Sequence, residues 1–181
     1  MHKTRKAAPA ASAVAFLRGV NVGGNNVVPM AKVVSAFEAL GFGAVKSIGH
    51  AGNLLFEGSD EDAALETALM KGLKAKLKLE CVVVVRQLEA LRALVESEPF
   101  GAADRPEVKR YVAFLAGPPP VKVKLPIRDD KGGFELFEQR RLDVFARAWP
   151  VAGRSSFPVI DKLYGVPATV RNWNTVVKLS R

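Results

Sequence analysis

The hydrophobic residues of the chain form short unbroken runs that alternate with segments in which they recur every three or four positions. The first run, residues 13–17, is apolar throughout, which indicates a strand buried on both faces. A helical pattern follows over residues 30–40, with Gly41 placed to end it. For the first half, the pattern predicts strand 13–20, helix 30–40, strand 44–48, strand 53–57, helix 60–78 and strand 81–86.

Strands and helices in this order make the β-α-β-β-α-β pattern of a ferredoxin-like fold. A further helix is predicted over residues 88–96, before Pro99. Proline, glycine and aspartate then cluster between residues 98 and 108, which is typical of a boundary between units. We therefore expect a ferredoxin-like subdomain over residues 13–98.

The second half repeats the alternation of strands and helices. Strands are predicted at 111–115 and around 134–138 and 142–149, and helices at 158–164 and 173–179. The prolines of residues 118–126 indicate a loop or an edge strand. No internal sequence repeat is visible, so the halves are expected to share a fold and not a sequence. The fold class is α+β, with a second, smaller α+β unit of fewer strands over residues 108–181.

Length and composition exclude several classes of protein. With 181 residues, 49% of them hydrophobic, the chain is long enough to bury about 70% of its unfolded surface. The single cysteine, Cys81, is expected to be a buried, reduced thiol in a strand. No apolar run reaches the roughly 20 residues of a membrane helix, and the start lacks the apolar core of a secretion signal. We expect a cytoplasmic protein without membrane contact, with a disordered basic tail at 1–12.

The net charge of +9 and the pI near 9.9 favour partners that carry phosphate, because a basic protein attracts them at long range. Part of this charge has a structural explanation. Lys71, Lys74 and Lys78 share the outer face of the predicted helix 60–78. The charge points to a phosphate-bearing small molecule or a nucleic acid without identifying either.

The loop from Arg18 to Met30, RGVNVGGNNVVPM, is the first candidate site. Gly23 and Gly24 permit positive φ and Asn25 tolerates it, so backbone N–H groups can converge on an anion. The loop also leads into a helix N-terminus, where negative charge is favoured. The alternative is a tight connection that binds nothing. The glycine fingerprints of dinucleotide-binding and phosphate loops are both missing, which argues against nucleotide hydrolysis.

Two later segments are further candidates. Arg154 and Ser155 precede the helix 158–164, where a guanidinium and free N–H groups suit an anion, although an ordinary serine cap is the alternative. Asn172 is predicted to cap the last helix. Arg171 has no such structural role, and we consider that it points toward the same cleft as Arg18.

Three segments carry a resemblance to a known family. RGVNVGGNNVVPM resembles the opening signature of domain of unknown function 1697, a family of mostly bacterial hypothetical proteins. Gly52 and Asn53, before the apolar run 54–56, resemble its glycine-asparagine hairpin, and GVPATVRNWNTVVKL at 165–179 is similar to its C-terminal signature. The resemblance implies no established activity, substrate or cofactor. The chain departs from the family at 48–51, where isoleucine, glycine, histidine and alanine replace tyrosine, isoleucine, glutamine and serine.

Candidates for catalysis are few. His50 is the one histidine of the predicted fold, and a lone histidine in a hairpin turn is usually solvated. No paired cysteine or histidine spacing suits a metal, and no pair of carboxylates suggests an acid and a base. We therefore assign no catalytic residue, metal or cofactor.

Three hypotheses remain from the sequence. The first is a binding protein whose basic cleft holds a phosphate-bearing ligand or nucleic acid, gripped by arginines and backbone N–H groups. The second is an enzyme acting on a small anionic metabolite, with His50 transferring a proton. The third is a structural or protein-interaction module. The candidate ligand-binding residues are Arg18, Asn21, Gly23, Gly24, Asn25, Asn53, Arg154, Ser155, Arg171 and Asn172.

Overall fold

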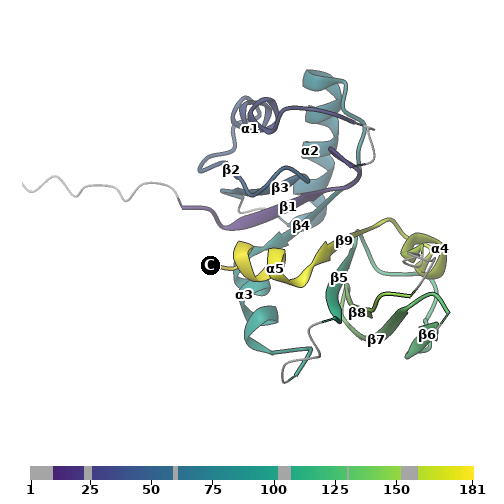
Figure 1. Cartoon of the computed structure of the whole chain (residues 1–181). Helices are drawn as coiled ribbons and strands as arrows, with labels where there is room; N and C mark the ends of the chain where they lie inside the picture. The colour runs from purple at the N-terminus through teal and green to yellow at the C-terminus, as the bar shows by residue number, and fades with distance from the viewer. Residues whose placement is uncertain (1–9, 23–25, 59–60, 102–106, 130, 152–158) are drawn as a thin grey trace, which may run out of the picture.

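The computed structural model describes residues 10–22, 26–58, 61–101, 107–129, 131–151 and 159–181. Within these ranges the chain forms two antiparallel sheets and several helices (Figure 1). The elements are β1 (Ala13–Leu17), α1 (Met30–Glu38), β2 (Lys46–Ser47), β3 (Asn53–Phe56), α2 (Asp62–Leu77), β4 (Val83–Gln87), α3 (Leu88–Glu96), β5 (Lys109–Leu115), β6 (Ile127–Asp129), β7 (Phe134–Arg140), β8 (Asp143–Ala148), α4 (Ile160–Tyr164), β9 (Ala168–Asn172) and α5 (Trp173–Leu179).

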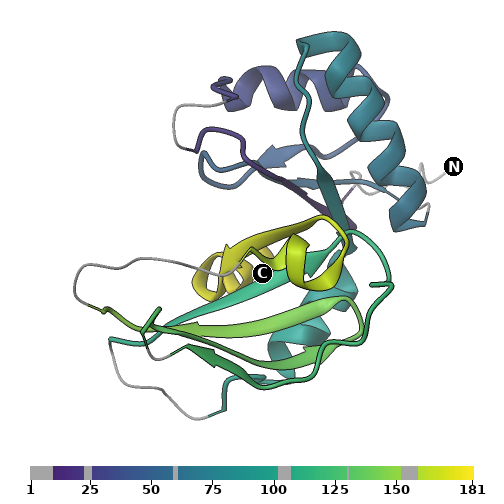
Figure 2. The same ribbon diagram turned by 90° about the vertical axis from the view of Figure 1, so that its right-hand side faces the viewer.

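The first sheet has the strand order β2-β3-β1-β4, and β1 lies in its interior. All five residues of β1 are buried, as the unbroken apolar run predicts. Ala13, Ala15 and Leu17 pack toward α1 and α2, whereas Val14 and Phe16 pack on the opposite face. In Figure 2, the first sheet separates α1 and α2 from the green strands of the second sheet.

The second sheet has five strands in the order β6-β7-β8-β5-β9, so the prediction of fewer strands in this half is wrong. The sequence pattern missed β6 and β9, which lie at the two edges. Strand β6 has only three residues, and each of the two strands follows a proline, Pro126 or Pro167. Residues 118–126 form neither helix nor strand, in agreement with the predicted loop.

A shared core fills the space between the two sheets. Phe16 of β1 stacks on Phe114 of β5, with ring centroids 4.5 Å apart and planes inclined by 11°. Helices α3 and α5 close the same core through Leu91 and Trp173. On its other face, the second sheet packs against α4 through a separate cluster that includes Tyr164. Buried apolar surface therefore joins the two halves continuously.

The paired strands reveal an internal repeat that the sequence analysis did not find. Residues 14–19 read VAFLRG and residues 112–117 read VAFLAG. Strand β1 pairs with β3 and β4 in the same register as β5 pairs with β8 and β9. The stacked rings of Phe16 and Phe114 thus occupy equivalent positions. The expectation of no repeat is wrong. The similarity is confined to a few strand residues, of which only the valines and phenylalanines face the shared core.

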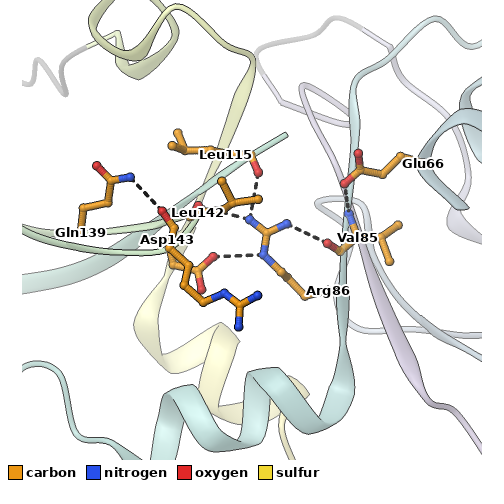
Figure 3. Close-up of polar contacts among 8 residues, drawn as sticks. Glu66, Val85, Arg86, Leu115, Gln139, Leu142 and Asp143 are labelled. Carbon is orange, nitrogen blue, oxygen red and sulfur yellow. Dashed lines mark hydrogen bonds and ion pairs between the residues drawn. The ribbon is translucent and has the colours of Figure 1, made fainter. Parts of the chain in front are cut away.

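Arg86 of β4 ties the first sheet to the second (Figure 3). Its Nε donates to Oδ1 of Asp143 at 3.0 Å, and its Nη2 donates to the carbonyl oxygens of Leu115 at 2.9 Å and Leu142 at 3.2 Å. Its Nη1 donates to its own preceding carbonyl, at Val85, and its guanidinium lies over the ring of Phe114. The buried guanidinium of Arg86 thus pairs with the carboxylate of Asp143, whose side chain is 17% exposed, between the two sheets.

Glu66 of α2 lies beside this network, and its Oε1 accepts a hydrogen bond of 2.8 Å from the backbone N–H of Val85. Burial raises the pKa of Glu66 above its usual value of 4.5, an effect that Asp62 reinforces and that the Val85 bond and Arg86 oppose. Between pH 4.5 and the raised pKa, the folded state therefore binds more protons than the unfolded state. Stability falls as the pH rises through this window.

We expect Glu66→Gln to raise the free energy of unfolding at neutral pH, because glutamine keeps the acceptor for Val85 and removes the buried charge. The measurement is urea unfolding of both proteins at about pH 7 and about pH 4. The gain should shrink at the lower pH, where Glu66 of the parent is protonated. An equal gain at both values would contradict this explanation.

Candidate functional site

The candidate site is built around Arg171, which β9 places opposite Val112 in the second sheet. The side chain crosses to the first sheet, where Nε donates to Oδ1 of Asn53 at 2.6 Å and Nη2 donates to the carbonyl of Leu17 at 2.8 Å. Nη1 donates to Oγ1 of Thr169 at 2.6 Å. Arg171 is therefore held rigidly, and the sequence-based prediction that it has no structural role is wrong.

Arg171 and Arg86 occupy equivalent positions in the two halves. Val14 pairs with Arg86, and Val112 pairs with Arg171. Each arginine donates to the preceding carbonyl of its own strand and to the last carbonyl of the opposite central strand, Leu17 or Leu115. Each guanidinium also lies over the stacked phenylalanine of the other half. The contacts are reciprocal, as in a two-fold symmetric interface.

The two equivalent sites differ in one acceptor. Nε of Arg86 donates to the carboxylate of Asp143, whereas Nε of Arg171 donates to the amide of Asn53. Asn53 and Asp143 are equivalent, because they lie opposite Phe16 and Phe114 respectively. The acceptors that hold Arg171 are neutral, and burial lowers its pKa to about 10. Arg171 remains a cation at neutral pH, so its charge is left without a bonded counter-ion in the described contacts.

A pocket of about 330 Å³ opens beside Arg171. Arg18 and Asp161 form an ion pair in its wall, with 41% and 29% of their side chains exposed. Oδ1 of Asp161 also accepts a bond of 3.2 Å from the backbone N–H of Ala168, which holds the carboxylate in place. Val22 and Val159 complete the rim and are more than half exposed. The pocket thus combines two guanidinium groups, one carboxylate and apolar surface.

A family model described as a protein of unknown function (DUF1697) matches residues 11–145. This chain belongs to the DUF1697 family. The predicted family membership is thereby confirmed, and the match includes the loop at 18–30 and the hairpin at 52–53. The C-terminal segment 165–179, which carries Arg171, lies beyond the matched residues.

A solved structure resembles the DUF1697 chain over nearly its full length. It is the structure of the conserved bacterial protein SP0830 from Streptococcus pneumoniae, with a TM-score of 0.66 and 22% sequence identity. The similarity covers 94% of this chain and 97% of that one. No curated protein matches the chain. At this identity the likeness supports the mixed α+β fold alone.

The structure brings together the two predicted arginines of this DUF1697 protein that it describes, since Arg18 and Arg171 line the same pocket. Asn53 lies at the base of the site through its bond to Arg171. Asn172 caps α5, as predicted, by accepting a bond of 2.9 Å from the N–H of Asn174. The other predicted residues Gly23, Gly24, Asn25, Arg154 and Ser155 lie outside the described residues.

Asn21 supports the loop. Its Oδ1 accepts from the N–H of Val28 at 2.8 Å, and its Nδ2 donates to the carbonyls of Val28 and His50 at 2.9 Å. It adopts φ of 55°. Asn21 thereby joins the loop after β1 to the turn before β3. Asn21, a candidate ligand-binding residue by sequence, thus has a structural role in the described contacts.

The sequence missed Asp161 and Thr169, which contact the two arginines. Asp161 lies in the first turn of α4, where an acidic residue is ordinary, and Thr169 lies in the strand that the pattern missed. Neither carried a signal of its own. Their roles depend on contacts between residues more than 100 positions apart or on the pairing of an unrecognised strand.

Other candidate chemistry is not assembled in the described parts of the chain. His50 is exposed in the turn before β3 and does not line the pocket. Cys81 lies just before β4 and not in a strand, and burial raises its pKa to about 11, so the thiol is protonated at neutral pH. Within the described ranges, no three histidine, cysteine or acidic side chains are grouped to hold a metal, and no helix has the length and apolarity to cross a membrane.

Proposed function

We propose that this protein is a binding protein that takes a phosphate-bearing ligand in the pocket between Arg18 and Arg171. The observation that carries the proposal is the neutral amide of Asn53 at the position where the equivalent site has the carboxylate of Asp143. Arg171 is a partly buried cation without a bonded counter-ion in the described contacts. Such a cation attracts an anion, because fewer solvent dipoles screen its charge than in bulk water.

Arg18 supplies the exposed half of the proposed site. Its guanidinium offers a planar fork that matches phosphate oxygens, and its current partner is the carboxylate of Asp161. An incoming phosphate would replace the carboxylate of Asp161 as the partner of Arg18. Arg171 is already hydrogen-bonded, so it would attract the phosphate through its positive charge and form no new hydrogen bonds. Asp161 therefore sets a threshold: a ligand must interact with Arg18 better than a carboxylate does.

The substitution that tests the proposal is Asn53→Asp. It creates an arginine-aspartate pair at Arg171 like the existing pair of Arg86 and Asp143. The fold should therefore persist while the charge of Arg171 is neutralised. We expect the affinity for inorganic phosphate to fall by at least about tenfold, because a contact charge pair is worth more than the 1.4 kcal/mol of one decade. The measurement is isothermal titration calorimetry with inorganic phosphate.

Asp143→Asn is the matched control, since it makes the opposite exchange at the equivalent site. It should leave phosphate binding at Arg18 unchanged. Equal binding by the parent and Asn53→Asp would contradict the proposal, and so would a parent protein that binds no phosphate. A labelled single-stranded RNA in the same comparison tests whether the phosphate belongs to a nucleic acid, which would add a steep salt dependence.

We also infer the finer architecture and the location from these features. We propose that residues 13–98 form a ferredoxin-like subdomain, which the element order and the strand order β2-β3-β1-β4 support. Residues 108–181 would form the second subdomain, and the repeated VAFL segment supports a common plan. We propose a cytoplasmic protein with a basic N-terminal tail. The predicted extent of that tail, 1–12, is too long, because the N–H of Ser12 donates to the carbonyl of Phe56 at 2.9 Å and its carbonyl accepts from the N–H of Leu88 at 2.8 Å.

A further inference from the structure

The outer part of the second sheet carries a row of charged residues that the proposed phosphate pocket does not use. Arg128 of β6 lies opposite Glu135 of β7, Glu135 lies opposite Arg147 of β8, and Arg147 lies opposite Arg110 of β5. Directly opposed residues on adjacent strands share one face of a sheet. The row therefore crosses four strands on one face, as three guanidinium groups and one carboxylate.

Three of these residues are stacked on aromatic rings. The guanidinium of Arg147 lies 4.2 Å from the ring centre of Phe137, that of Arg128 lies 5.2 Å from Trp149, and that of Arg110 lies 5.8 Å from Phe100. Contact with the face of a ring attracts a guanidinium cation and restricts where it lies. A further planar group could add to such a cluster of rings and guanidinium groups.

A pocket of about 380 Å³ lies over this row. Its lining includes Arg128, Arg147 and Trp149 together with the carboxylates of Glu107 and Glu135. The volume is in the range of small-molecule sites. Two positive and two negative groups balance, so a simple anion gains little there. A planar ligand that carries both donors and acceptors suits the lining better.

We infer that this pocket binds a nucleobase. The ring system would stack on the layer that Arg128 and Trp149 form, as bases stack on aromatic rings and guanidinium planes in other proteins. Glu107 supplies an acceptor for the amino and imino N–H groups of a base. Glu135 and Arg147 form an ion pair of 3.5 Å, and Arg147 also donates to the carbonyl of Phe100 at 3.3 Å, so this pair would share its remaining acceptor and donor positions with the base. The site shares no lining residue with the Arg18 pocket, so the inference stands independently of the proposed phosphate site.

Nuclear magnetic resonance tests this directly, because the chain has only two tryptophans and hence two indole N–H signals. Trp149 borders the pocket, whereas Trp173 is buried in the shared core. Trp149→Phe assigns the signals by removing one. On titration with each of the four ribonucleoside monophosphates, and with short single-stranded oligonucleotides, we expect the Trp149 signal to shift saturably and the Trp173 signal to stay.

Variants locate the response. Arg128→Ala, on an exposed edge strand, should weaken the affinity by about tenfold, the loss typical of one stacking partner. Arg128→Lys should not restore it, since lysine keeps the charge without the plane. The exposed-helix change Lys71→Ala should leave the titration unaltered. A shift with monophosphates identifies a nucleotide site, and a shift with oligonucleotides alone identifies a nucleic-acid site. No shift with either, or an affinity unchanged by Arg128→Ala, overturns the inference.

Discussion

Arg86→Met is expected to lower the free energy of unfolding by about 3–5 kcal/mol, the cost of leaving one member of a buried ion pair alone. Methionine retains much of the packing volume and removes every donor to the second sheet. The largely covered carboxylate of Asp143 would then lack its guanidinium, and the carbonyls of Leu115 and Leu142 would lose their bonds from Arg86, although the N–H of Leu115 still donates to Leu142. Urea unfolding followed by circular dichroism measures the change.

The equivalent substitution Arg171→Met is the matched control. It breaks a comparable number of bonds but leaves only neutral acceptors behind, so its cost should be smaller, about 1–3 kcal/mol. Adding Asp143→Asn to Arg86→Met should recover part of the loss, because the buried charge is then removed. Equal losses for the two arginines, or no recovery in the double variant, would show that the charge of Asp143 is not what makes the Arg86 site costly to break.

The difference between these arginines also shows where sequence reasoning reached its limit. Arg171 was singled out because its neighbours had structural roles and it had none. Its actual contacts are with Leu17 and Asn53, which are more than 100 residues away. Arg86 carries no such signal in the sequence, because it only ends an apolar run, as many strand residues do. Only the packing of the two sheets shows that both arginines donate to a backbone carbonyl of the opposite half.

Helices and strands with a clear local pattern were predicted correctly, whereas the number of strands was not. The helix at 88–96 and the strand predicted at 13–20, which the structure ends at Leu17, were found because a local pattern, a helical period or an apolar run, is sufficient to specify each of them. Strand β9 could not be found in this way. Its five residues form a strand by pairing with β5, which is distant in the sequence. The local capping signal of Asn172 indicates only the helix that follows.

The repeat was missed for a related reason. Four consecutive identical residues are too few to stand out in 181, and the helices around them differ. The identity becomes meaningful once the structure shows that Phe16 and Phe114 stack on each other and that each has a guanidinium from the other half over its ring. The seam between the halves, and the contrast between Asn53 and Asp143, could not be inferred before that.

Phe16→Ala is expected to destabilise both halves together, by about 3–5 kcal/mol, since it removes a fully buried ring from the shared core. Both tryptophans lie in the second half, whereas Phe16 lies in the first, so fluorescence reports on the half that is not mutated. If the core makes the chain a single cooperative unit, the thermal transitions measured by tryptophan fluorescence and by far-ultraviolet circular dichroism fall by the same amount.

Phe114→Ala provides the reciprocal test, because its ring is the other member of the stack. The two single losses should not add in the double variant, since the second substitution removes a contact that the first has already lost. A fluorescence transition that stays in place while the circular dichroism transition falls would mean that the halves unfold separately. Equal shifts of the two transitions would mean that the contacts of Arg86, Arg171 and the stacked rings make the halves unfold cooperatively. The pocket beside Arg171 would then depend on the folding of both halves, because Arg18 comes from one half and Arg171 from the other.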